Sequence, residues 1–492
     1  MNVPLLSRRG GSWSRRPHRL APLLVLIACA SAPPTVAIEE LDVAIPPRWN
    51  AEDDGAEAVA APEGARPAPD AAWWTAFGEP RLDALVETAL RDNRDLRAAL
   101  ARLEAAAAAR TIAGADGLPQ VDLTFDPQRA RRLFLGFPFG GGGVPSATAT
   151  VMNLSLNVRW ELDLWGRVAN GESAAIGDLQ AVAAEHAGAR LSLAAQVCRA
   201  WFAAVAAQRQ LELAEATVAA FRATADDVRD RYRRGMRPAL DVHQAALNVA
   251  NAEADVAQRR DALQRARHRL DVLAGRYPAG REVVDATLPA TLPAVPTGLP
   301  AELLERRPDL VAAERRLAAA GCRVAAAKAA LYPRISLTAG GGTASTELED
   351  LVDEDFRVWN IGANLLQPLL RGGALRADVA RAEARRAEAL AAYGDAVLTA
   401  FAEVEDTLQS DARLADRLAT LQSAAEHAAT ARDLARERWQ LGLTDFLAVA
   451  DGQRQAYFAE AARIDVERAR IDNRIDLFLA LGGDAAPEGA TP

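Results

Sequence analysis

The feature that most constrains this chain is a long run in which apolar and polar residues alternate strictly. It reads MNLSLNVRWELDL and covers residues 152–164. Successive side chains of a β-strand point to opposite faces, so the run predicts a strand with one apolar and one polar face. At roughly 3.3 Å per residue the strand would be about 43 Å long, whereas strands of globular proteins usually have about 5–6 residues. The pattern therefore predicts a structure that needs unusually long, two-faced strands.

The spacing of proline predicts equally long helices. No proline occurs in residues 146–237 or 369–486, and helices tolerate proline only near their first turn. The alanine- and leucine-rich segment 167–234 would run about 100 Å as one continuous helix. Globular helices average about 11–12 residues, so this segment indicates a coiled, needle-like or tubular object.

The two halves of the chain repeat each other. DLRAALARL at 95–103 matches DLVAAERRL at 309–317, and YRRGMRPALDV at 232–242 matches WQLGLTDFLAV at 439–449. A chain with such an internal repeat is expected to fold as repeated units. Each half should therefore contain, in order, a helix, a strand, a loop, a strand, a long helix, a glycine turn and a helix.

The repeat also divides the chain into predicted parts. The expected strands lie at about 119–128, 149–164, 333–342 and 356–368, with an apolar glycine-rich loop over 131–146 and an acidic loop over 343–355. The expected domains are a first repeat at 73–275, a proline-rich linker at 276–300, a second repeat at 301–482 and a disordered tail at 483–492.

The N-terminus has the form of an export signal. Residues 1–28 carry five arginines and no acid, and their apolar run LAPLLVLIA is too short to span a bilayer. The tetrapeptide LIAC, which ends at Cys29, resembles a bacterial lipobox, whose cysteine is acylated and becomes the new N-terminus. Ala30, rather than an aspartate, at the next position points to the outer membrane. Residues 29–72 predict a lipidated, flexible tether.

Charge and residue types argue against several functions. The formal net charge of the 492 residues is -9, and removing the five arginines of the signal region lowers it to -14. An acidic chain without basic tracts is a poor nucleic-acid binder. Cys198 and Cys322 lie in helical sequence and are interpreted as small core residues. The five histidines have no metal-ligand spacing, and the glycine run at 136–143 lacks the Lys-Ser/Thr of a phosphate loop, so neither a cofactor nor an enzyme is predicted.

Four strands are too few to close around a channel within one chain. In hydrocarbon an open sheet edge would leave backbone groups unpaired, whereas three chains would supply twelve strands, within the usual range of outer-membrane barrels. A 43 Å strand tilted near 45° would cover about 30 Å of bilayer. Its apolar face would meet lipid, and its polar residues would face the lumen: Asn153, Ser155, Asn157, Arg159, Glu161 and Asp163. A half-buried strand in a soluble sandwich is the alternative explanation of the pattern.

Several segments together resemble the TolC-like outer membrane factors, and most closely the lipidated NodT/OprM branch of RND-type efflux systems. The segments are WWTAFGEPRLDALVETALRDNRDL at 73–96, RWELDLWGR at 159–167, ERRPDLVAAERRLAAA at 305–320, YPRISL at 332–337 and QPLLRGG at 367–373. The resemblance implies a mainly α fold with a membrane β-barrel portion, in which a homotrimer forms a twelve-stranded barrel and a long α-helical periplasmic tunnel. It implies a channel in the outer-membrane lipid, with a periplasmic adaptor and an inner-membrane RND transporter as partners.

The same resemblance implies a gate at the two helix–turn–helix tips around Gly235 and Gly442. In the family a ring of carboxylates just past these turns narrows the pore, because three like charges repel one another and attract cations. The matching positions are Asp241 in the first half, and Ala448 and Asp451 in the second, where Ala448 departs from the frequent aspartate. Contacts that hold the turns closed are expected from Arg237, Thr444 and Asp445. The arginine-rich run 229–237 is either an adaptor-docking surface or a solvated helix end.

Two other classes of protein account for less of the sequence. A periplasmic coiled coil accounts for the helices but leaves the four alternating strands unexplained. The conduit of an ABC-driven type I protein secretion system is the alternative among transporters, and the lipobox together with the WW…FGEP opening favours efflux over it. The exported substrate cannot be read from the residues, because a wide water-filled duct needs no specific ligands to pass a solute.

Overall fold

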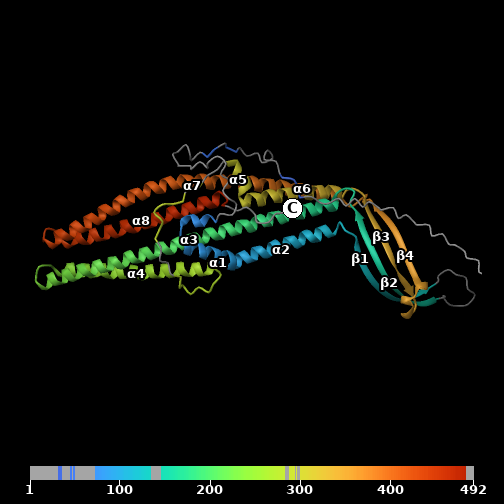
Figure 1. The fold of residues 1–492 in the computed structure, drawn as a ribbon, viewed down its shortest axis with the longest axis horizontal. Helices are drawn as coiled ribbons and strands as arrows, with labels where there is room; N and C mark the ends of the chain where they lie inside the picture. Colours follow the sequence, from blue (N-terminus) through green and yellow to red (C-terminus); the bar gives the residue numbers. More distant parts are fainter. Residues whose placement is uncertain are drawn as a thin grey trace, which may run out of the picture.

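The structure is a computed structural model, and it describes residues 32–35, 45–46, 48–49, 72–133, 146–282, 287–293, 295 and 300–483. Figure 1 shows an elongated molecule with two helical hairpins at one end, a helical bundle in the middle and a four-stranded sheet at the other end. None of the described helices combines the length and apolarity that crossing a membrane requires.

The two predicted repeats are confirmed, and their helices match in length. The first repeat contains α2 (Arg94–Ala115), α3 (Arg167–Arg233) and α4 (Ala239–Leu273), and the second contains α6 (Pro308–Ala329), α7 (Ala374–Gln440) and α8 (Phe446–Ala480). The paired helices have 22, 67 and 35 residues respectively. The long helix predicted over 167–234 is therefore α3, which spans about 100 Å at 1.5 Å per residue.

The hydrophobic core lies where both repeats overlap in the middle of the molecule. The 3₁₀ turn Trp73–Phe77, α1 (Pro80–Asp92) and α5 (Pro300–Arg306) cover this region beside α3, α7 and α8. Trp201 is fully buried there, and Trp73 stacks on Phe478 with 4.9 Å between ring centroids. Each fully buried large apolar side chain contributes about 1.5–3 kcal/mol to folding, so this middle region anchors the long hairpins.

The four strands form one antiparallel sheet in the order β1-β2-β3-β4. Their bounds are β1 (Gln120–Leu133), β2 (Ser146–Leu162), β3 (Arg334–Ser345) and β4 (Arg357–Leu366). The central pair joins the two repeats, because β2 belongs to the first and β3 to the second. Among the described residues, strands β1 and β4 each have one neighbouring strand, so each has one edge without a partner there.

The predicted two-faced pattern extends over the whole sheet. Cross-strand pairs such as Leu123–Leu156 and Trp160–Leu337 place most of the large apolar residues of the four strands on one face. That face carries Val121, Leu123, Phe125, Met152, Leu154, Leu156, Val158, Trp160, Ile335, Leu337, Trp359, Ile361 and Leu365. On the other face Asn157 Nδ2 donates to Thr124 Oγ1 at 3.1 Å and to Ser155 Oγ at 3.0 Å, so polar side chains bond across β1 and β2.

The predicted end of the second strand at residue 164 is wrong. β2 ends at Leu162, and the chain turns there, since the Leu164 amide donates to the Leu162 carbonyl at 3.0 Å. Asp163 therefore does not lie on the polar face of the strand. Its Oδ2 accepts from the Ala169 amide at 2.7 Å and caps the first turn of α3, whose first amides otherwise lack partners.

The other strand ends also differ from the prediction. β1 continues to Leu133 and β3 to Ser345, so the loops expected over 131–146 and 343–355 are shorter than predicted, and residues 134–145 lie outside the described part. β4 covers Arg357–Leu366 instead of 356–368. Cross-strand pairing prolongs the strands beyond the alternating pattern, and Pro127 is tolerated in β1 because this is an edge strand.

Two described parts of the predicted flexible tether pack on the helical body. Pro33 is buried beside Gly177, and its carbonyl accepts from Arg315 Nη1 at 3.4 Å. Trp49 is fully buried and meets Phe401 of α7 edge-on, with 6.0 Å between ring centroids. The expectation of a wholly flexible tether is therefore wrong at these positions. The predicted signal peptide, Cys29 and residues 484–492 lie outside the described residues.

Trp49→Ala is expected to lower the thermal unfolding midpoint of the detergent-purified protein. Removing a fully buried tryptophan costs about 3–5 kcal/mol, because apolar contacts are lost and a cavity is left. Tyr277→Ala is the control, since that aromatic ring is almost fully exposed. Equal midpoints for both variants, measured by circular dichroism, would show that the Trp49 contact contributes nothing to stability.

Candidate functional site

The two helical hairpins end in turns of the same construction. In the first turn the Gly235 amide donates to Tyr232 and the Met236 amide to Arg231, at 2.8 and 2.9 Å. In the second, Gly442 and Leu443 bond Trp439 and Arg438 at 3.0 and 2.8 Å. Gly235 and Gly442 have φ angles of 76° and 72°, which a residue with a Cβ adopts only at a cost. The glycines that the sequence singled out thus terminate α3 and α7.

Trp439 joins the two hairpins at their tips. It lies on α7, yet its side chain is only 2% exposed, because it packs between α7 and the end of the α3–α4 hairpin. Its Nε1 donates to Asp227 Oδ2 at 2.6 Å. The guanidinium groups of Arg231 and Arg237 lie over the ring, 4.6 and 4.1 Å from its centroid. Cations over a desolvated indole ring are attracted by about 2 kcal/mol each, so this cluster holds the hairpins together.

Arg237 makes a second link between the tips. Its Nη2 donates to the Thr444 carbonyl at 3.3 Å, and its Nη1 lies 4.0 Å from Asp241 on the same hairpin. The structure thus brings together Arg237 and Thr444, which the sequence named as residues that hold the turns closed. Thr444 takes part through its backbone oxygen rather than through its side chain.

The three aspartates named from the sequence occupy different environments. Asp241 lies in the first turn of α4, where an acid also favours the helix dipole, and its side chain is 15% exposed. Asp445 caps α8, since its Oδ1 accepts from the Ala448 amide at 3.0 Å. Asp451 is 54% exposed and bonds only Arg454 Nη2, at 2.8 Å, one turn further along α8. Asp445 and Asp451 are thus both exposed to solvent, whereas Asp241 is partly buried.

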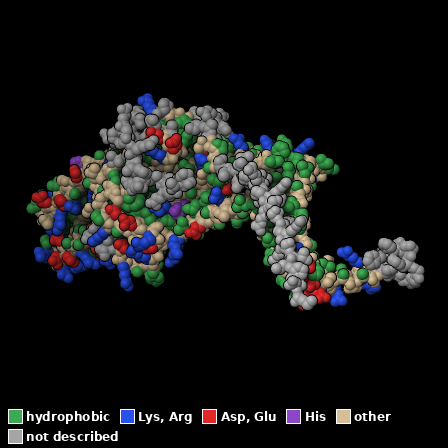
Figure 2. Space-filling model, turned by 45° about the vertical axis from the view of Figure 1, so that its right-hand side comes forward, with side chains coloured by type: hydrophobic (Ala, Val, Ile, Leu, Met, Phe, Trp, Pro, Cys, Tyr) green, Lys and Arg blue, Asp and Glu red, His purple; other side chains and the backbone are tan. Residues whose placement is uncertain are grey.

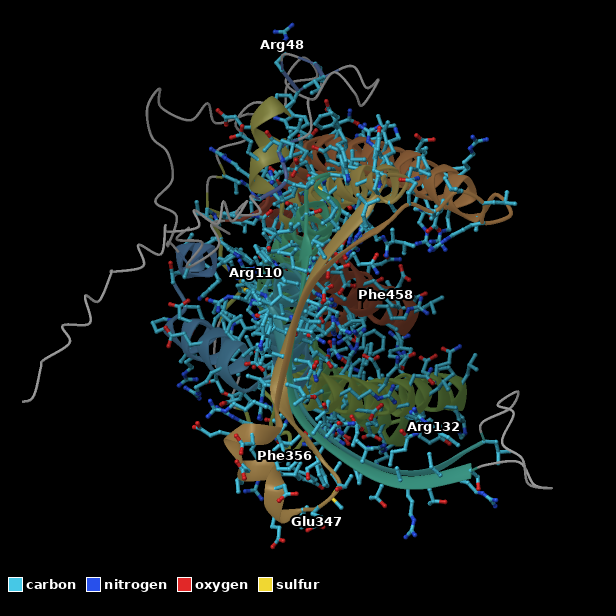
Figure 3. All side chains as sticks on the ribbon, turned by 90° about the vertical axis from the view of Figure 1, so that its right-hand side faces the viewer. Arg48, Arg110, Arg132, Glu347, Phe356 and Phe458 are labelled. Atoms are coloured by element: carbon cyan, nitrogen blue, oxygen red, sulfur yellow. The ribbon has the colours of Figure 1, made fainter. Side chains whose placement is uncertain are left out.

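Asp451 shares a face of α8 with an exposed aromatic ring. Phe458 lies seven residues further along, which returns to the same side of a helix, and its ring is largely exposed. Figure 3 shows Phe458 pointing to the open side between the α7–α8 and α3–α4 hairpins. Figure 2 shows many charged side chains at the hairpin end and mostly hydrophobic ones where the helices meet the strands.

A further polar contact joins α4 to α8 above the tips. The Tyr457 hydroxyl donates to Asp255 Oδ2, and Arg259 Nη2 donates to the Tyr457 oxygen at 3.4 Å. Burial, together with the bond to Asp255, raises the pKa of Tyr457 above its usual value. The phenol is therefore neutral at physiological pH and able to donate, so this contact persists across the physiological range.

The aromatic and acidic parts of the tip contact were missed in the sequence. Trp439 and Tyr232 occupy equivalent places in the repeat, three residues before each turn glycine, yet Tyr232 is 46% exposed. Only the packing of one hairpin on the other distinguishes them. The arginine-rich run 229–237 is likewise divided, because Arg231 and Arg237 turn onto Trp439 whereas Arg229 and Arg233 make exposed pairs with Asp226 and Asp230.

The two hairpin tips contact each other through ion pairs, hydrogen bonds and ring contacts. A noncovalent contact of this kind can form and break. Across the described ranges no group of three or more His, Cys, Asp or Glu is placed to hold a metal ion. At the opposite end of the molecule, Arg167 at the start of α3 donates twice to Glu161, at 3.0 and 2.9 Å. Glu161 therefore fastens the sheet to the long helix.

Comparison with known proteins agrees with this architecture of sheet, long helices and paired tips. Residues 85–276 and 299–483 match the outer membrane efflux protein family. The chain belongs to this family, in its NodT/OprM-type branch. It is an outer-membrane channel protein of efflux pumps and not an enzyme.

Three relatives illustrate the match. The pyoverdine export outer membrane protein OpmQ of Pseudomonas aeruginosa is 32% identical over 414 residues, covering 84% of this chain and 87% of the relative. The toluene efflux pump outer membrane protein TtgF of Pseudomonas putida is 32% identical over 418 residues, covering 84% and 85%. The structure of the outer-membrane channel OprN superposes with a TM-score of 0.83 at 30% identity, covering 92% of this chain and 99% of that one.

Trp439→Ala is expected to loosen both tips. Each 1.4 kcal/mol of lost stability makes local opening about tenfold more frequent, and a buried tryptophan contributes about 3–5 kcal/mol. Backbone amides at 225–245 and 436–450 should therefore exchange with deuterium at least about tenfold faster by mass spectrometry. Tyr232→Ala, the repeat-related control, should leave the α7–α8 tip unchanged. Unaltered exchange in Trp439→Ala would contradict a holding role for the indole.

Proposed function

We propose that three copies of this chain close their sheets into one twelve-stranded barrel and form the exit duct of an RND efflux pump, reached through a periplasmic adaptor. The observation that carries the proposal is a sheet with one continuous apolar face and two unpartnered edges, β1 and β4. Lipid on that face requires every edge group to be hydrogen-bonded. Pairing β1 of one copy with β4 of the next satisfies this requirement and gives an even strand number.

The barrel assigns roles to the residues of the polar face. Asn153, Ser155, Asn157 and Arg159 alternate on the face opposite the apolar one and would line the water-filled lumen. Glu161 shares that face and is held by Arg167 at the periplasmic mouth. We do not extend this role to Asp163, because it caps α3. The acylated Cys29 would add a lipid anchor on the periplasmic side of the same membrane.

Small molecules are the proposed cargo. The names of related proteins include pyoverdine export, toluene efflux and cation efflux, which is a chemically diverse set. A duct that serves such different solutes needs width rather than a binding site, so the pump would select the substrate. A type I secretion conduit is the competing assignment, and it requires an ABC transporter as the partner.

The closed state would be maintained at the tips. The Trp439 cluster and the bond from Arg237 to Thr444 tie each copy's hairpins together, so an opening movement has to break them. Three copies of Asp451 on the open side would narrow the entrance with like charges. An adaptor that binds the exposed arginines Arg229 and Arg233 could pull the α3–α4 hairpin away from Trp439. Opening would then require no covalent chemistry.

In-cell cross-linking, followed by detergent purification of a tagged chain and mass spectrometry, tests the assembly. We expect a trimer that carries an adaptor and an RND transporter, and acyl groups on Cys29 that Cys29→Ser removes. An ABC transporter in place of the RND protein would move the chain to type I secretion. A monomer that is soluble without detergent would overturn the barrel.

Asp451→Asn is expected to weaken the cation preference of single channels in planar bilayers. A unit charge about 4 Å from an ion contributes about 1 kcal/mol in water, so the cation-to-anion permeability ratio should fall roughly fivefold. Asp92→Asn is the control, because this carboxylate also pairs with a neighbouring arginine but lies on α1 in the middle of the molecule. Equal selectivity of the two variants would place the constriction elsewhere.

A further inference from the structure

Two arginines follow the apolar positions 121–127 on one face of β1, and Leu133 is the next residue on that face after them. Side chains two residues apart share a face of a strand, so Arg129 and Arg131 lie on the same face as Leu123 and Phe125. Their cross-strand partners on β2 are Thr150 and Thr148, which follow the last apolar partner, Met152, away from the helices. The face thus changes from apolar to basic and hydroxylated within one pair of residues.

These arginines have no acidic partner in the described part of the chain. Arg131 Nε donates to Ser146 Oγ at 3.0 Å, and Arg129 makes no hydrogen bond or ion pair there. Both residues are exposed. By contrast, Arg357 at the start of β4, which shares this face by register, is paired with Glu354. Two guanidinium groups that lack an acidic partner among the described residues thus lie beside an apolar band, an arrangement that favours an external anion.

We propose that Arg129 and Arg131 bind the phosphate groups of the anionic glycolipid that forms the outer leaflet of the membrane. This inference rests on the proposed barrel, which puts the apolar face in lipid and the far ends of β1 and β2 at the outer surface. The arginine stems can lie along the apolar band while their heads extend to the headgroup level. A guanidinium group presents paired donors that match phosphate oxygens.

The acidic β3–β4 loop of a neighbouring copy is the competing partner. Glu347 and Glu349 lie at the opposite edge of the sheet from β1, and Figure 3 shows Glu347 and Arg132 well apart. Lipid is favoured over this loop because the Arg129 and Arg131 side chains lie on the apolar face of the sheet, which would contact lipid. The Arg132 side chain lies on the polar face. Arg132 pairs across the ladder with Ala147 and is the matched control on the same strand.

The test compares the double variant Arg129→Gln/Arg131→Gln with Arg132→Gln. The probe is bis-phosphorylated lipid A added to detergent-purified protein, and the measurements are the thermal midpoint and the number of lipid A molecules retained in native mass spectrometry. We expect the unmodified protein and Arg132→Gln to bind lipid A. The double variant should bind at least about tenfold more weakly, because charge-assisted bonds to phosphate are lost. Equal binding by all three would overturn the proposal.

Two further measurements separate this inference from its alternatives. The double variant should retain single-channel conductance, whereas an unmodified protein without conductance would refute the barrel itself. Gel filtration tests whether the arginines instead contact the acidic loop of a neighbouring copy. It compares the oligomeric state of Arg129→Glu/Arg131→Glu with and without the additional changes Glu347→Arg/Glu349→Arg. Loss of the trimer that the second pair of changes restores would assign the arginines to the subunit interface and overturn the lipid assignment.

Discussion

The unpaired backbone edges of β1 and β4 are the constraint on which the rest of this molecule depends. Each edge strand carries N–H and C=O groups that no other strand of the described residues bonds, and hydrocarbon supplies no water to replace such a partner. In the proposed barrel, a sheet with a largely apolar face would be completed by further copies. The head-to-tail pairing of two different edges would make a ring, since a rotation that joins β4 to β1 can be repeated until it closes. The length of the strands would then match the thickness of the membrane.

The long helices separate two tasks in space. About 100 Å of continuous helix lies between the sheet and the tips, so contacts at the tips are remote from the strands that would form the proposed barrel. The buried middle region, where both repeats contribute to one core, holds the hairpins in place. The contact between the tips centres on the indole ring of Trp439, with the Arg231 and Arg237 guanidinium groups and the Asp227 carboxylate around it. In the proposed mechanism this contact would hold the closed state, and a partner protein would open it by separating the two hairpins.

Most of the fold was predictable because it depends on periodicity. Alternation over 152–164, the absence of proline from the helical segments and the repeat between the halves are local patterns that one strand or helix expresses by itself. The predictions are wrong at residues whose environment is set by contacts with other segments of the chain. Asp163 fits the alternating pattern but caps α3, because the free amides at a helix start attract a carboxylate. Trp49 lies in a stretch that is rich in proline and acids, and it is ordered by a pocket formed from another part of the chain.

By itself the sequence determined the element order, the two faces of the sheet, the tip glycines and the family resemblance, since each is recorded in residue spacing or in short motifs. Only the tertiary structure decided which tip residues interact. Trp439 and Tyr232 are equivalent in the repeat, but one is buried and the other exposed, because the α7–α8 hairpin lies against the α3–α4 hairpin on one side only. Environments of this kind arise from packing between distant segments, which residue spacing does not specify.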